Sequence, residues 1–215
     1  GFLEGVRDLT RAHGVVLIFD EMITGFRLSN GGAQALFGVT PDLTTLGKGM
    51  ANGYPLSAVV GRADIMREFE DVFFSFTMGG ECLALAAAKG TLEKVRREPV
   101  TKTLRHRGER LQSGVRTRID ACGLAETLAI TGHPSWSVLT IQDHQTAEMW
   151  AIKTLILQEV LRRGILSIGT HTLSYAHSDE DVDTFVAVYD EVLPMVRDAL
   201  TTPGGVRDAL GCEPL

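Results

Sequence analysis

The feature that most constrains the fold is an unbroken apolar run, residues 15–19 (Val-Val-Leu-Ile-Phe), which ends on the acidic pair Asp20 and Glu21. β-Branched and aromatic residues in such a run are typical of a parallel strand that is covered on both faces. Residues 2–13 before it repeat apolar side chains at the period of an amphipathic helix, and Gly14 can end that helix. A helix that leads into a buried strand predicts an α/β fold with a mainly parallel sheet.

Short elements continue this pattern up to about residue 98. We expect a short helix at residues 33–37, strands near residues 43–46, 57–60 and 73–76, and a helix at residues 81–96. Pro99 then marks a break in the chain. These elements predict part of an α/β domain over residues 1–98.

From residue 99 onward the sequence changes to long, charged helices and short strands. The helices are expected at residues 104–121, 146–163 and 179–200, and the strands at residues 127–131, 136–141, 165–168 and 172–175. Ser178 is a suitable N-cap for the last helix, whose first turn is acidic. This pattern predicts a separate α+β domain over residues 99–215, with the tail after Pro203 loosely held.

Charge and cysteine usage exclude several classes of protein. The net charge is −6 over 215 residues and the arginines are scattered, so we expect no basic face for nucleic acid. Cys82, Cys122 and Cys212 are odd in number and lie in no CxxC motif, which argues against a disulfide framework and against a metal site. No apolar stretch reaches the roughly 18 residues that span a membrane. We therefore expect a cytoplasmic protein with neither nucleic-acid nor membrane partners.

Asp20 and Lys48 are the candidate reactive residues. Ligands bind at the carboxyl ends of parallel strands, and Asp20 lies at the end of the apolar run. Lys48 stands between Gly47 and Gly49, which allow backbone and ligand to approach closely. A confined lysine can form a Schiff base, and a carboxylate can hold a ring nitrogen in its protonated form, which are the two needs of a pyridoxal phosphate site. Simpler roles stay open, since an acid after a strand is often a cap and most lysines are solvated.

Five segments resemble the class III aminotransferases, and most closely their glutamate-1-semialdehyde aminomutase-like branch. They are residues 17–27, 31–48, 53–61, 76–80 and, more faintly, 174–183. The resemblance implies a fold type I transferase that depends on pyridoxal phosphate. Under it, the first domain is the C-terminal part of the large, mainly parallel-sheet domain that binds the cofactor, and the second is the C-terminal α+β small domain.

The resemblance also implies roles for four residues. Lys48 would bind pyridoxal 5′-phosphate covalently and later move a proton, while Asp20 would pair with the pyridine nitrogen. Met22 falls where the family places an apolar side chain, usually valine, against the ring. Thr77 falls on a threonine that binds the cofactor phosphate, commonly across a dimer interface. Lys48 and Asp20 are thus the expected catalytic residues, and all four are expected to bind the cofactor.

Four other polar residues are expected to have structural roles. Glu21 fits structural hydrogen bonding better than chemistry, and Arg27 fits a loop salt bridge better than recognition of a substrate carboxylate. His171 and His177 stand at a strand end and near a helix cap, where a hydrogen-bonded structural histidine is commoner than a catalyst.

Complete members of the family carry an N-terminal half, with the phosphate loop and several strands, that this sequence does not contain. We therefore expect the chain to be a C-terminal half, truncated or separately encoded, which needs an N-terminal half and forms a dimer of complete units. The expected function is that of an aminotransferase or aminomutase that moves an amino group between an amine and a carbonyl compound. A racemase or decarboxylase of the same fold, and a non-catalytic half that binds a partner, stay open. Glu81 and Cys82 stand where much of the class has Asn-Pro, so the substrate is not predicted.

Overall fold

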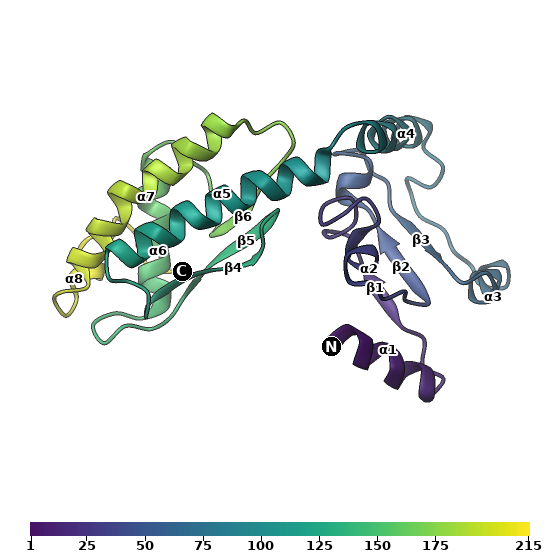
Figure 1. Cartoon of the computed structure of the whole chain (residues 1–215), viewed down its shortest axis with the longest axis horizontal. Helices are drawn as coiled ribbons and strands as arrows, with labels where there is room; N and C mark the ends of the chain where they lie inside the picture. Colours follow the sequence, from purple (N-terminus) through teal and green to yellow (C-terminus); the bar gives the residue numbers. More distant parts are fainter. The chain divides into compact units, whose positions relative to one another are not determined.

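The computed structural model describes the whole chain, residues 1–215, as two compact units that comprise residues 1–102 and 103–215. Each unit contains one three-stranded sheet (Figure 1). Helix α5 (Val100–Ala121) begins in the first unit, and most of its residues belong to the second. No helix of the chain combines the length and the apolar character needed to cross a membrane.

The first unit is an α/β arrangement around a small mixed sheet. Its elements are α1 (Phe2–Ala12), β1 (Ile18–Asp20), α2 (Gly32–Phe37), β2 (Leu43–Leu46), the 3₁₀ turn η1 (Lys48–Met50), β3 (Ala58–Gly61), α3 (Ala63–Met66), the 3₁₀ turn η2 (Arg67–Glu70) and α4 (Cys82–Arg97). The sheet order is β1-β2-β3, with β1 parallel and β3 antiparallel to β2. The expected helices and the parallel pairing of the first strand are confirmed.

Local signals explain where these helices begin and end. Gly14, just after α1, has φ +64°, a backbone conformation that glycine adopts at little cost. Glu81 caps α4, because its carboxylate accepts the N–H groups of Leu83 at 2.8 Å and Ala84 at 2.6 Å. Pro99 separates α4 from α5, as the sequence predicts.

A buried carboxylate, that of Asp42, joins α1 to the sheet of the first unit. It accepts hydrogen bonds from the Leu17 N–H at 2.8 Å, from Arg7 Nη2 at 2.9 Å and from Arg62 Nη1 at 3.0 Å. These bonds hold the pKa of Asp42 well below its usual range, and the bond from the Leu17 N–H has the largest effect. One side chain therefore fixes α1, the segment that leads into β1, and the residue that follows β3.

The expectation that the first strand is covered on both faces is wrong for this chain. Only the end of the apolar run forms β1, and β1 is an edge strand. Val15, Val16 and Ile18 are 54%, 46% and 54% exposed. Because no strand of the chain pairs with the outer edge of β1, this apolar edge stays open to solvent.

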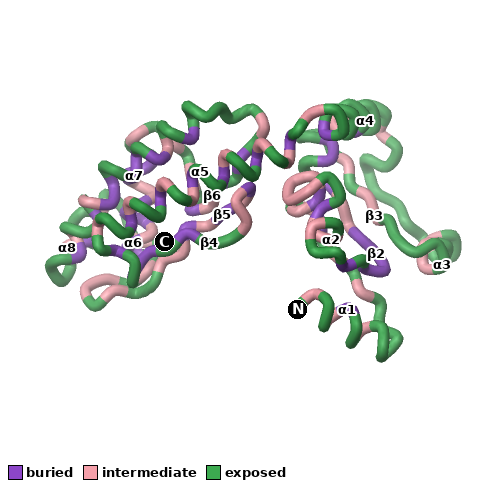
Figure 2. Tube along the Cα trace, in the orientation of Figure 1, coloured by how far each residue is buried: buried purple, intermediate pink, exposed green.

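The expected strand at residues 73–76 is also absent. These residues pair with no other strand, so they lack the hydrogen bonds that define a sheet. The ring of Phe74 instead contacts the rings of Phe69 and Phe76 edge-on, with centroids 5.1 and 5.2 Å away. Figure 2 shows this segment and most of α4 as exposed.

The second unit is an antiparallel sheet with long helices. Its elements after α5 are β4 (Leu128–His133), β5 (Trp136–Ile141), α6 (Met149–Arg162), β6 (Thr170–Thr172), α7 (Asp179–Ala199) and α8 (Gly205–Asp208). The sheet order is β4-β5-β6, and both pairings are antiparallel. Buried positions recur along α5, α6 and α7 (Figure 2), and the core side chains that are at most 1% exposed include Leu111, Val115, Leu155, Ile156, Val192 and Val196. The three long helices and the first two strands were predicted and are confirmed.

The predicted cap of α7 is confirmed as a reciprocal capping box. The Asp181 N–H donates to Ser178 Oγ at 3.0 Å, and the Ser178 N–H donates to Asp181 Oδ2 at 2.7 Å. Two backbone donors at the start of the helix are thereby satisfied.

The last two predicted strands are misplaced. Residues 165–168 form no strand, and Leu166 and Ile168 are 85% and 71% exposed. The third strand is β6, which begins two residues earlier than the predicted strand at residues 172–175. Its position is set by pairing with β5, which the local sequence does not specify.

The tail after Pro203 is held against α6, which contradicts the expectation that it is loose. Val206 on α8 is 1% exposed. The Gly211 N–H donates to Gln158 Oε1 at 2.7 Å, and the Leu215 N–H donates to Thr154 Oγ1 at 2.9 Å. Hydrogen bonds donated by the tail to side chains of α6, 53 and 61 residues earlier, therefore order the end of the chain.

Candidate functional site

Asp20 and Lys48 both lie at the carboxyl ends of the two parallel strands. Asp20 is the last residue of β1, and Lys48 comes two residues after the end of β2. In the register of the pair, Asp20 lies opposite Thr45. Because parallel strands end at the same edge of a sheet, the fold brings the acid and the lysine to one edge.

The Asp20 carboxylate is held through one of its two oxygens. Oδ1 accepts the Met22 N–H at 3.0 Å and the Thr45 hydroxyl at 3.3 Å. Oδ2 accepts no hydrogen bond within the chain. The side chain is exposed, so Oδ2 can accept a hydrogen bond from a ligand.

Lys48 has an unusual backbone for a residue with a side chain. Its φ is +45°, in the left-handed region, which costs of order 1 kcal/mol or more outside glycine. It opens the turn η1, in which the Met50 N–H donates to the Gly47 carbonyl at 2.9 Å. Met50 and Ala51 are buried directly after it, which anchors the turn. The lysine side chain is exposed and forms no ion pair within the chain.

Met22 lies against the backbone that carries Lys48. A Cβ atom added at Gly47 would overlap the Cε and Sδ atoms at the end of the Met22 side chain, so any larger residue here would displace this thioether. Glycine here lets the thioether and the turn approach closely. The contact of Met22 with a cofactor ring stays a prediction.

Thr77 lies apart from these contacts in the first unit. It is exposed in a turn, residues 77–80, that precedes α4. Its hydroxyl forms no hydrogen bond within the chain. Its contact with the cofactor phosphate stays a prediction.

Glu21 has the structural role that was predicted for it. Its side chain is 1% exposed, and it accepts the N–H groups of Ala33 at 2.8 Å and Gln34 at 2.9 Å, together with the Thr24 hydroxyl. The carboxylate thus caps α2 from the loop that follows β1. Arg27 on the same loop is half-buried, and burial lowers the pKa of its guanidinium; its role stays a prediction.

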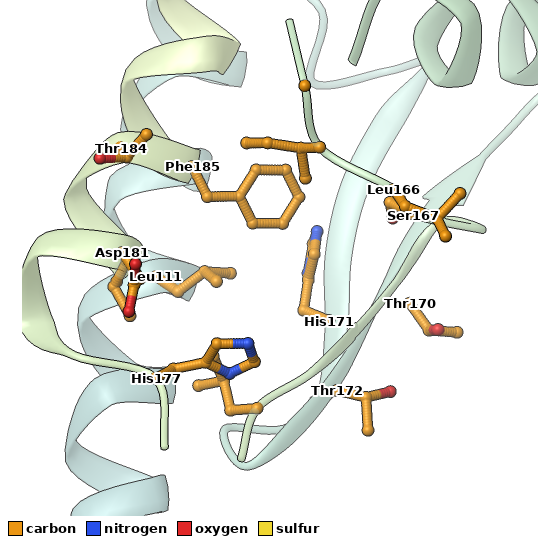
Figure 3. Close-up of a pocket in the computed structure, with 14 residues that line it drawn as sticks. Leu111, Leu166, Ser167, Thr170, His171, Thr172, His177, Asp181, Thr184 and Phe185 are labelled. Atoms are coloured by element: carbon orange, nitrogen blue, oxygen red, sulfur yellow. The ribbon is translucent and has the colours of Figure 1, made fainter. Parts of the chain in front are cut away.

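The second unit contains a pocket of about 380 Å³, lined by α5, β6, α7 and the segment before β6 (Figure 3). His171 is 3% exposed at its wall, and its ring meets that of Phe185 edge-on with centroids 5.3 Å apart. Its Nδ1 bonds the Ser137 hydroxyl at 3.0 Å and its Nε2 bonds the Tyr189 hydroxyl at 2.9 Å. Burial lowers the pKa of His171 to about 4, so the ring is neutral at pH 7. The predicted structural role of His171 is confirmed.

The other ionisable groups of this pocket are also engaged in the fold. His177 Nδ1 accepts the Ser174 N–H at 3.0 Å, which confirms a structural role for this histidine. The Asp181 carboxylate is the acidic member of the capping box of α7. The pocket therefore has a mixed apolar and polar lining, in which His171, His177 and Asp181 form hydrogen bonds within the second unit.

Thr45 and Asp42 are two residues that sequence reasoning missed. Asp42 follows a proline and resembles a turn residue in the sequence, yet its buried carboxylate pairs with the buried Arg7 and with the more exposed Arg62. Thr45 lies within a predicted strand, three residues before Lys48. The register that places Thr45 opposite Asp20 is a property of the folded pair of strands, and the sequence carries no local signal for it.

Comparison with known proteins gives a consistent family match. The family described as Aminotransferase class-III matches residues 1–176. The glutamate-1-semialdehyde 2,1-aminomutase of Neisseria meningitidis serogroup A is 46% identical over 204 residues, which cover 89% of this chain and 48% of that protein. The 3-aminobutyryl-CoA aminotransferase of Cloacimonas acidaminovorans is 34% identical over 203 residues, which cover 93% of this chain and 49% of that protein.

Solved structures share the fold. The PLP internal aldimine form of the FumI protein of Sphingopyxis sp. MTA144 matches with a TM-score of 0.85 at 26% identity, over 97% of this chain and 50% of that one. The α/β fold of this chain thus corresponds to half of such a structure. Likewise, the chain spans about half the length of the curated relatives it matches, 48% and 49%.

Proposed function

This chain belongs to the class III aminotransferases, a family that uses pyridoxal phosphate, and on that premise we propose that it is part of an enzyme that moves an amino group between an amine and a carbonyl compound. One observation carries the proposal. Asp20 and Lys48 lie at the carboxyl ends of two hydrogen-bonded parallel strands, within the residues that match the family. The names of the relatives include both an aminomutase and an aminotransferase, which favours amino-group transfer over racemisation or decarboxylation.

The residues present fit pyridoxal 5′-phosphate. Asp20 offers Oδ2 as an acceptor for a ring N–H, while Oδ1 is already engaged. Lys48 offers an exposed amine without an ion pair, on a backbone turn anchored by buried residues. Met22 offers an apolar thioether next to that turn, and Thr77 offers a hydroxyl without a partner. These are the donor and acceptor types that the ring, the aldehyde and the phosphate of the cofactor require.

Each residue would have a distinct part in the chemistry. When bound, the cofactor supplies an electron-withdrawing ring conjugated to the substrate amine. Lys48 Nζ would hold the cofactor between turnovers and, once released, take a proton from the substrate and return it at a different carbon. The ionised Asp20 carboxylate would keep the ring nitrogen protonated through Oδ2. Met22 would exclude water from one side of the ring.

We further propose that residues 1–98 correspond to the C-terminal part of the cofactor-binding domain and residues 99–215 to the small domain. The compact units at residues 1–102 and 103–215 support this division. An N-terminal half, within the same polypeptide or separate, would pair with the open edge of β1, and the complete units would form a dimer. The exposed apolar side chains of Val15, Val16 and Ile18 support this partner, since an unpaired apolar edge favours strand addition.

A cofactor spectrum tests the proposed function. The full-length gene product that contains these residues, purified with pyridoxal 5′-phosphate, is expected to absorb at about 410–430 nm through lysine-bound cofactor. Lys48→Ala should abolish this band, because it removes the amine that is proposed to form the Schiff base. The matched control is Lys89→Ala, which removes an exposed lysine on α4 and should leave the band intact.

Two outcomes would contradict the proposal. A purified protein without the band, or a band that survives Lys48→Ala, would favour the alternative of a non-catalytic half that binds a partner. The native mass of the same sample tests the partner proposal, since a mass of two complete units supports it and a monomer of this chain with bound cofactor contradicts it.

A further inference from the structure

Thr45 connects the two strands that carry the proposed reactive residues. It lies on β2 opposite Asp20 of β1, and its carbonyl accepts the Glu21 N–H at 3.0 Å. Its hydroxyl donates to Asp20 Oδ1 at 3.3 Å, across the pair of strands. Lys48 follows three residues later on the same segment. Thr45 is therefore the side chain through which the lysine-bearing strand contacts the acid.

The two donors to Asp20 act on the same oxygen. The Met22 N–H comes from the chain beyond β1, and the Thr45 hydroxyl comes from β2. With only the backbone donor, the carboxylate could swing about that single bond. The second donor, from a different strand, restrains the rotation and leaves Oδ2 as the free acceptor.

We propose that Thr45 is a positioning residue, which holds Asp20 through Oδ1 so that Oδ2 stays available to the N–H of the cofactor ring; this rests on the proposed function of the chain. A neutral hydroxyl suits the task, because it orients the carboxylate without adding a positive charge that would compete with the protonated ring nitrogen.

The neighbouring threonine has a different environment and serves as a control. Side chains alternate between the faces of a strand, so Thr44 points to the opposite face from Thr45. Thr44 is 3% exposed, and its Oγ1 accepts a hydrogen bond from Gln34 Nε2 at 3.2 Å. Replacing Thr44 by valine therefore shows how the loss of a threonine hydroxyl from β2 affects the ¹⁵N shift and kcat when the contact with Asp20 is kept.

The experiment compares Thr45→Val, Thr45→Ser and Thr44→Val in the full-length gene product loaded with pyridoxal 5′-phosphate labelled with ¹⁵N in the ring. The ¹⁵N chemical shift reports whether the ring nitrogen is protonated. In Thr45→Val we expect the shift to move toward the unprotonated value and kcat to fall about threefold to tenfold, with KM little changed, as for the loss of one hydrogen bond. Thr45→Ser, which keeps the hydroxyl, should retain the wild-type ¹⁵N shift and kcat. Thr44→Val should leave the ¹⁵N shift unchanged.

The proposal is overturned if Thr45→Val keeps the wild-type ¹⁵N shift, or if Thr44→Val moves the shift as much as Thr45→Val does. Should Thr45→Val not fold, Thr45→Ala provides the same comparison with a smaller side chain. Failure of the proposed function is a separate result, because the wild-type protein would then carry no lysine-bound cofactor and would show no ¹⁵N signal from it.

Discussion

The two units of this chain differ in how completely they bury their own apolar side chains. In the second unit, Leu155 and Val192 are 1% and 0% exposed. In the first unit, Phe2, Ile18 and Leu83 are 80%, 54% and 58% exposed. Because burial of apolar surface is the main force in folding, the second unit forms a closed core from its own residues, whereas the first keeps apolar surface free for further packing.

The two units also differ in whether their ionisable side chains are exposed to solvent or buried and hydrogen-bonded within the fold. The proposed reactive residues, Asp20 and Lys48, are exposed in the open unit. In the closed unit the buried His171 has both ring nitrogens bonded within the fold. The unit with the candidate site is therefore the one that leaves apolar surface uncovered, which agrees with the proposal that an N-terminal half packs against it.

The largest effect is expected from Asp20→Asn in the open unit. The amide cannot stabilise a protonated ring nitrogen, so kcat should fall about 10²- to 10³-fold while cofactor is still bound, as when a preorganised electrostatic contact is removed. Steady-state kinetics of the full-length gene product measure kcat, and its cofactor absorbance measures whether cofactor is still bound. The control is Asp8→Asn, which changes an exposed acid on α1. A nearly wild-type kcat in Asp20→Asn would contradict the proposal that Asp20 keeps the ring nitrogen protonated.

Truncating one leucine in each unit tests the difference in burial. Leu155→Ala should lower the free energy of unfolding by about 3 kcal/mol, because it leaves a cavity in a packed core. Leu85→Ala on α4 should cost under about 1 kcal/mol, since Leu85 is 49% exposed. Urea unfolding of the 215-residue chain measures both, by far-UV circular dichroism and by tryptophan fluorescence.

Tryptophan fluorescence separates the units, because Trp136 and Trp150, the two tryptophans of the chain, both lie in the second unit. Equal losses of stability for Leu155→Ala and Leu85→Ala would contradict the difference in burial between the two units.

A smaller effect is expected from acid on the second unit. His171 has a pKa of about 4 in the fold and about 6.5 when unfolded, so the unfolded state binds more protons between these values. Stability is therefore full above about pH 6.5 and falls as the pH drops toward 4, by about 2 kcal/mol between pH 7 and pH 5. Urea unfolding followed by tryptophan fluorescence at each pH measures this loss.

Two variants control the acid experiment. His171→Gln should flatten the dependence on pH, and His177→Gln, at an exposed histidine, should leave it unchanged. The buried Asp42 of the first unit has a lowered pKa, so its contribution is present above the unfolded pKa of 3.8 and is lost only in stronger acid. A wild-type second unit that keeps its full stability at pH 5 would contradict the neutral, buried His171.

Elements whose signals are local could be predicted from the sequence. Helix α7 begins at Ser178 because the cap and its acidic partner are three residues apart, and α4 lies between the Glu81 cap and Pro99. Strands were predicted less well, since a strand exists only where a partner pairs with it. Residues 136–141 have two partners in β4 and β6, whereas the similarly apolar residues 73–76 have none.

In the candidate site, too, some features can be predicted from the sequence and others depend on the fold. The end of the apolar run at Asp20, the glycines on either side of Lys48 and the resemblance to the class III aminotransferases can all be read from the residues themselves. The cap that Glu21 provides for α2 and the contact of the Thr45 hydroxyl with Asp20 become visible only in the folded chain. These hydrogen bonds join groups 12 or 13 and 25 residues apart, and their geometry depends on strand register, which no residue type encodes alone.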